Sequence, residues 1–123
     1  MNHAHVPPVL ITADGRVELL HDPTGPAIAD PQRTGMPEID SRRLAADDRV
    51  ILYSDGISKR VRSDGTPFGT DGIIAAARTA ANATAASTVN AVEEAVLSAA
   101  KDELEDDATI VVLAPTGSGA TAR

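Results

Sequence analysis

The sequence predicts an α+β fold, with two helices covering one face of a mostly antiparallel sheet. Apolar runs of strand length occur three times before residue 54 and once more near the C-terminus. Residues 70–104, which lie between them, are rich in alanine and favour helix. The order strand, strand, strand, helix, helix, strand is typical of folds that place helices on one side of an antiparallel sheet. The 123 residues suffice for one small domain.

The first two strands are predicted to form a hairpin. The apolar runs Val9 to Ile11 and Val17 to Leu20 flank an Asp14-Gly15 pair. An Asp-Gly pair between two such runs is a strong hairpin signal. Residues 21–43 are rich in proline and glycine and lack a sustained apolar period, so they are predicted to form a long connection.

The third strand covers Val50 to Tyr53, an apolar run that is too short for a helix and rich in strand formers. Asp55 therefore stands just past the end of a strand. The polar, glycine-punctuated residues 58–70 are predicted to form a loop, with Phe68 as its packing anchor. Lys59, Arg60 and Arg62 either belong to a solvated part of this loop or face an acidic or phosphorylated partner.

The alanine-rich stretch is predicted to form two helices that are separated by a break near residues 82–86. Thr70 is a candidate N-cap of the first helix, with Asp71 in the first turn, where the helix dipole favours negative charge. The second helix is predicted to start at Ser87. Its apolar residues then form one stripe at helical spacing: Val89, Val92, Val96, Ala100 and Leu104.

The last predicted strand covers Ala108 to Pro115, and the small polar residues after it have the composition of a disordered end. The domain is accordingly assigned to residues 1–115 and the tail to residues 116–123.

The composition excludes several classes of function. A net charge of −7, with only 11 Lys and Arg residues, argues against binding of nucleic acid. The absence of cysteine excludes disulfides and thiolate metal sites, while oxygen-ligand sites remain open. No apolar run approaches the length of a membrane span, and no signal peptide is evident, so we expect a cytoplasmic protein with no membrane partner.

Asp55 and Asp106 form the candidate site. If the strand before Asp55 and the strand after Asp106 are antiparallel neighbours, these carboxylates meet at one edge of the sheet. Two such carboxylates repel each other unless a cation lies between them, and hard Mg²⁺ or Mn²⁺ prefers oxygen ligands. Gly56 would let the chain turn beside the ion with no Cβ in the way. The alternative is an ordinary Asp-Gly turn and a solvated acidic strand start.

Three segments resemble the metal-dependent protein phosphatases of the PPM or type-2C family, in the bacterial SpoIIE-like branch. "LYSDGISKRVRSDGTPFGTDGI" is similar to the family's LYTDG segment with its later FG pair, and "DDATIVVL" to its closing motif. "NHAHVPPVLITADGRVELL" resembles the family's N-A-G-H-x-P-P hairpin. The three segments occur in the family's order and cover most of residues 2–114.

The resemblance implies a fold and a set of site residues. The fold would be the C-terminal part of an α-β-β-α sandwich. Asp55 and Asp106 match the family's two late metal-binding aspartates, which would hold Mg or Mn. Asp107 matches the neighbouring Asn or Asp of the motif, and Thr109 matches its threonine, a structural hydrogen-bonding residue.

The implied activity is hydrolysis of phosphoserine or phosphothreonine on a signalling protein, such as an anti-sigma-factor antagonist. The family domain is about twice as long, and its early aspartates belong to an N-terminal half that this sequence lacks. Lys59 also replaces the family's usual Glu. We therefore expect a partial phosphatase domain that is inactive alone and requires a complementary N-terminal half. The alternative is a non-catalytic remnant that binds proteins in partner-switching signalling.

Overall fold

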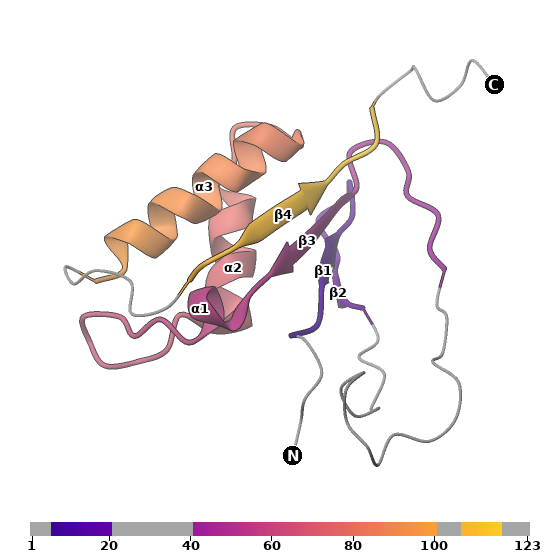
Figure 1. Cartoon of the computed structure of the whole chain (residues 1–123). Helices are drawn as coiled ribbons and strands as arrows, with labels where there is room; N and C mark the ends of the chain where they lie inside the picture. Colours follow the sequence, from indigo (N-terminus) through magenta and orange to yellow (C-terminus); the bar gives the residue numbers. More distant parts are fainter. Residues whose placement is uncertain (1–5, 21–40, 101–106, 117–123) are drawn as a thin grey trace, which may run out of the picture.

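The computed structural model describes residues 6–20, 41–100 and 107–116, which form a four-stranded sheet and three helices (Figure 1). The elements are, in chain order, β1 (Val9–Ile11), β2 (Val17–Leu19), β3 (Arg49–Tyr53), α1 (Asp55–Ser58), α2 (Gly69–Arg78), α3 (Ala85–Ser98) and β4 (Ile110–Leu113). The predicted α+β class is confirmed. None of the helices in this described part is both long and apolar enough to cross a membrane.

The sheet has the strand order β2-β1-β3-β4, and every neighbouring pair is antiparallel. The predicted hairpin is confirmed, with Ile11 paired to Val17 across the Asp14-Gly15 turn. Asp48 is buried at the start of β3, and its carboxylate accepts hydrogen bonds from the Ala13 and Ala45 backbone N–H groups, at 3.0 and 2.8 Å. This carboxylate therefore fixes the hairpin turn to the segment that leads into β3.

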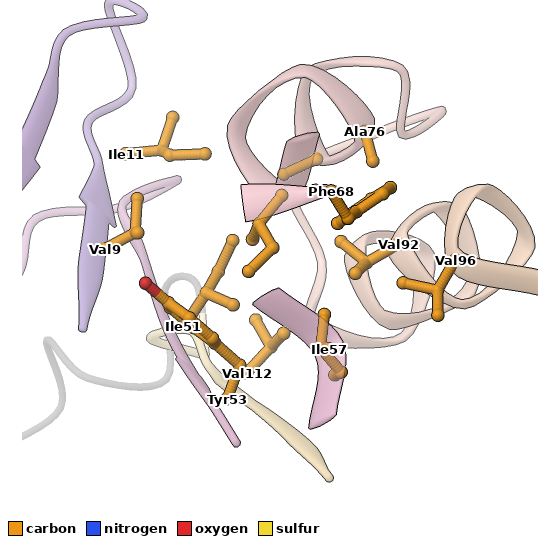
Figure 2. Packing of buried hydrophobic residues seen from close by; sticks show 12 residues of the cluster. Val9, Ile11, Ile51, Tyr53, Ile57, Phe68, Ala76, Val92, Val96 and Val112 are labelled. Atoms are coloured by element: carbon orange, nitrogen blue, oxygen red, sulfur yellow. The ribbon is translucent and has the colours of Figure 1, made fainter. Parts of the chain in front are cut away.

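The core lies between one face of the sheet and the helices (Figure 2). Successive side chains of a strand point to opposite faces of the sheet, so every second strand residue points into the core. The residues that pack against them come from α1, α2, α3 and the loop before α2. The buried cluster comprises Val9, Ile11, Ile51, Tyr53, Ile57, Phe68, Ile73, Ala76, Ala77, Val92, Val96 and Val112. The expected role of Phe68 as a packing anchor is confirmed, since only 4% of it is exposed.

The opposite face of the sheet is also apolar. Val50 pairs with Leu10 on one side and Leu113 on the other, and Leu52 pairs with Val111, so these five side chains share a face. Leu10 and Val50 are buried, whereas Val111 and Leu113 are 46% and 52% exposed.

The helix boundaries differ from the predicted ones. Phe68, and not Thr70, is the N-cap of α2, because the chain already turns at Gly69. The Thr70 hydroxyl instead hydrogen-bonds the Tyr53 hydroxyl at 2.8 Å. The helix α3 begins at Ala85 rather than Ser87, since the Thr84 side chain caps it by accepting the Ser87 N–H. Leu104 lies outside the described residues.

The basic residues of the loop after α1 do not share one environment, contrary to prediction. Arg60 is buried and donates from Nε to the Val96 carbonyl at 2.6 Å and from Nη2 to the Ala100 carbonyl at 3.2 Å. The Arg62 guanidinium lies 5.4 Å from the centre of the Phe68 ring. Both interpretations of Arg60, as a solvated residue and as a partner contact, were wrong because its charge is used to cap the C-terminal end of α3.

Candidate metal centre

The site predicted from the sequence lies where β3 ends beside the start of β4. Tyr53 pairs with Ile110, which confirms that the two strands are antiparallel neighbours. Beyond this pair, the Ser54 N–H donates to the Thr109 carbonyl at 2.9 Å, and the Thr109 N–H donates to Ser54 Oγ at 2.9 Å. The two chain segments are therefore held together past the last residues of both strands.

Ser54 is a residue of this edge that the sequence analysis missed. Its backbone has the extended conformation of an N-cap before α1, yet its side chain does not cap that helix. Its Oγ accepts from Thr109 and lies 3.4 Å from the Asp107 carbonyl oxygen, to which it donates. A serine between a buried strand and an Asp-Gly pair is typical of a residue whose side chain hydrogen-bonds the backbone. The sequence does not show which backbone group it bonds.

Gly56 packs against the Asp107 peptide of the second segment. A Cβ built on Gly56 would lie 2.1 Å from the Asp107 carbonyl oxygen and 2.9 Å from its carbon. No side chain fits there, so glycine is required for space. The missing Cβ makes room for the Asp107 peptide, and the expected turn of the chain beside an ion stays a prediction.

The Asp55 carboxylate lies at the first residue of α1 and is half-exposed. Its Oδ2 is 3.1 Å from Lys59 Nζ, one helical turn further on, and the Lys59 side chain is 78% exposed. Asp55 thus already has a cation beside it. An exposed pair at this spacing contributes only about 0.3–0.5 kcal/mol, so it leaves the carboxylate open to a stronger ligand.

The other predicted site residues are only partly described. Asp107 is exposed, and its peptide packs against Gly56. Thr109 joins the edge through its backbone groups, and the structural role that the resemblance implies for it stays a prediction. Asp106 lies outside the described residues, so the meeting of its carboxylate with that of Asp55 stays a prediction.

Asp55-Gly56 behaves differently from two other Asp-Gly pairs of the chain. Gly15 and Gly65 have positive φ angles of 89° and 88°, as tight turns require. Hydrogen bonds from the side chain and then the backbone of Thr66 lower the pKa of Asp64, and the Thr12 hydroxyl has the largest lowering effect on the pKa of Asp14. These two aspartates serve their own turns, whereas Asp55 begins a helix at the sheet edge.

The donor atoms at this edge suit a hard cation in type but not in number. Carboxylate oxygens are the ligands that Mg²⁺ prefers, and the ion usually retains several waters. Across residues 6–20, 41–100 and 107–116, however, no three His, Cys, Asp or Glu side chains gather closely enough to hold a metal ion. Among these described residues Asp55 supplies a carboxylate at the edge, and the binding of Mg or Mn there stays a prediction.

The chain was compared with known protein families, curated proteins and solved structures. The family model for stage II sporulation protein E (SpoIIE) matches residues 1–115, nearly the whole chain. No curated protein and no solved structure matched it.

Proposed function

Because the chain belongs to the SpoIIE family of PPM-type phosphatases, we propose that it forms the C-terminal part of a metal-dependent serine/threonine phosphatase domain. The observation that carries this proposal is the contact of Gly56 with the Asp107 peptide. That contact packs Asp107, which follows the predicted ligand Asp106 in the sequence, against the segment that begins with Asp55. The substrate would be phosphoserine or phosphothreonine on a signalling protein, such as an anti-sigma-factor antagonist.

In this proposal Asp55 and Asp106 hold a Mg or Mn ion, and Gly56, Asp107 and Thr109 position them. A bound divalent ion lowers the pKa of a water molecule and neutralises charge as a phosphoester is hydrolysed. Ser54 and Gly56 have a positioning role, because their contacts hold the segment after β3 against the segment before β4. The remaining ligands would come from polypeptide outside these 123 residues, as a complementary phosphatase half.

The second candidate function is a protein-binding module without catalysis in partner-switching signalling. The observation that favours it is the ion pair between Lys59 and Asp55, which places a positive charge of the chain itself at the predicted ligand. A cation beside a carboxylate opposes the approach of a second cation, although an exposed pair such as this one does so weakly. The two functions differ in whether Asp55 binds a metal ion at all.

A binding measurement separates the two functions. We expect the full 123-residue chain to bind Mn²⁺ weakly, as followed by the electron paramagnetic resonance signal of the free ion. Asp55→Asn and Asp106→Asn should each lower the affinity for Mn²⁺ by about tenfold or more. Removing a residue that only hydrogen-bonds a metal ligand already lowers metal affinity by about 10–100-fold, and the loss of a ligand itself should cost at least as much. Glu94→Gln, which removes an exposed carboxylate of α3, is the matched control and should bind as the unmodified chain does.

The same chain should not hydrolyse a phosphoserine peptide in the presence of Mn²⁺, because two carboxylates supply too little of a preorganised site. Turnover above the blank that is lost in Asp55→Asn would show that the chain is catalytically complete. Mn²⁺ binding that is indifferent to both aspartates would remove the metal assignment and leave the protein-binding function.

A further inference from the structure

We propose that the outer edge of β4 pairs with the β4 edge of a second copy of this chain, so that the two sheets join into one. In the strand order β2-β1-β3-β4, β4 has a neighbouring strand on one side only among the described residues (Figure 1). An open edge of this kind offers backbone N–H and C=O groups to another chain. The proposal concerns association only and holds for either proposed function, because no step of it requires a metal ion.

The backbone groups that β4 directs outward belong to Ile110 and Val112. In an antiparallel pair, opposite residues alternate between those that exchange hydrogen bonds and those that do not. The Ser54 N–H donates to the Thr109 carbonyl, so these two residues are of the first kind. Alternation from this pair along the register leaves the N–H and C=O groups of Ile110 and Val112 pointing away from β3. Within the part of the chain that the structure describes, these outward groups have no hydrogen-bond partner.

The strand β4 lacks the features that keep sheet edges from pairing. Natural edge strands are protected by charged side chains, by proline or by bulges. The other edge strand, β2, has Glu18 at its centre, and the Glu18 carboxylate accepts a hydrogen bond from Arg42 Nη1 at 3.0 Å. In contrast, β4 has the sequence Ile-Val-Val-Leu, without charge or proline, and its register with β3 has no bulge. The edge of β4 is therefore open to pairing.

A second copy is the occupant because this edge is complementary to itself. An antiparallel arrangement with a twofold axis at Val111 pairs Ile110 of each copy with Val112 of the other, and each pair exchanges both of its backbone hydrogen bonds. Val111 of one copy then lies opposite Val111 of the other, on the face where this side chain is 46% exposed. Both the backbone groups and the exposed apolar side chains of β4 find partners in this arrangement, and the apolar faces of the two sheets become continuous.

The same register keeps the acidic residues of the two copies apart. Symmetry about Val111 places Asp107 of one copy opposite Pro115 of the other, beyond the ends of the paired strands. Residues 108–114 are all uncharged. Like charges directly opposite each other destabilise a strand pair, and this stretch contains none. The net charge of −7 is therefore carried by residues outside the paired stretch.

The test uses single-cysteine variants in EDTA, because the chain has no cysteine of its own. The Cα atoms of a non-hydrogen-bonded antiparallel pair are about 4.5 Å apart, a distance that a disulfide spans, so Val111→Cys should form a linked dimer in a glutathione redox buffer. Leu113→Cys, on the same face and 52% exposed, is the matched control. Its two copies would be offset by four residues, or about 14 Å, so we expect linking at least about tenfold slower than for Val111→Cys.

Amide hydrogen exchange of the unmodified chain is the second measurement and needs no variant to fold. The N–H groups of Ile110 and Val112 should become protected as the protein concentration rises, whereas that of Val111, which bonds β3, should be protected throughout. Association through the apolar face alone, without pairing of the edges, would link both cysteine variants at similar rates and leave the outward N–H groups unprotected. Either result, or a chain that stays monomeric at every concentration, would overturn the proposal.

Discussion

At the scale of single residues, Gly56 allows the segment after β3 and the segment before β4 to pack closely at the sheet edge. Its missing side chain is replaced by the Asp107 carbonyl oxygen, 2.1 Å from where a Cβ would stand. In Gly56→Ala, either α1 or the segment before β4 must move. Overpacking of this kind costs about 1–3 kcal/mol, so we expect the free energy of unfolding to fall by about 2 kcal/mol.

Urea unfolding followed by circular dichroism measures this loss. The control is Ser58→Ala in the same short helix, which removes only a 3.4 Å contact to the Asp55 carbonyl and should change stability by less than about 0.5 kcal/mol. Equal stabilities of Gly56→Ala and the unmodified chain would mean that the two segments are not in contact in solution. The positions inferred for Asp55 and Asp107 would then be wrong as well.

At the scale of elements, the end of α3 depends on a side chain from the loop after α1. Arg60 donates to the carbonyl groups of Val96 and Ala100 at the C-terminal end of α3, where the Val96 carbonyl also accepts the Ala99 N–H. Replacing Arg60 by Leu leaves these groups without a charged donor. Hydrogen bonds from charged groups contribute about 1.5–3 kcal/mol, so Arg60→Leu should lower the free energy of unfolding by about 2 kcal/mol.

The matched control for this prediction is Arg43→Leu, which removes the same kind of side chain from an exposed position before β3. Amide hydrogen exchange should show faster opening of the last turn of α3 in Arg60→Leu and no change in Arg43→Leu. If both variants exchange alike at that turn, the guanidinium does not hold the helix end.

The elements that could be predicted from sequence are those with a local signal. The hairpin followed from two apolar runs around Asp14-Gly15. The antiparallel pairing of β3 and β4 was a condition of the predicted site, and the structure meets it. The helix α1 was missed because its four residues have no apolar period, and Thr84 was missed as a cap because it lies two residues inside the predicted break.

The site was predictable only in part, for a physical reason. The order of strands places Asp55 at an edge, but the role of Arg60 and the contact of Gly56 depend on which segments pack against them, and a linear pattern does not contain this information. The metal-binding roles of Asp55 and Asp106 remain predictions, since Asp106 lies outside the residues that the structure describes.

At the scale of the whole molecule, the second face of the sheet has the character of an interface. It is apolar from Leu10 through Val50 to Leu113, and its side chains on β4 are about half-exposed. Helices cover the other face (Figure 1). In the α-β-β-α sandwich that family membership implies, a second sheet would pack on this face, in line with the proposal that a complementary half completes the domain.

We therefore expect the isolated chain to self-associate through this face, despite its net charge of −7. Analytical ultracentrifugation at micromolar concentrations should show dimers or larger species. The double variant Val111→Thr and Leu113→Thr should shift them to monomers, because it removes apolar area while Thr keeps a high preference for strands. Leu19→Thr with Val61→Thr changes two side chains of similar exposure elsewhere and should leave the association intact.

A compact monomeric unmodified chain, with strand amides strongly protected from hydrogen exchange, would show that the sheet needs no second layer. The domain would then be complete by itself, and the search for a complementary half would lose its basis.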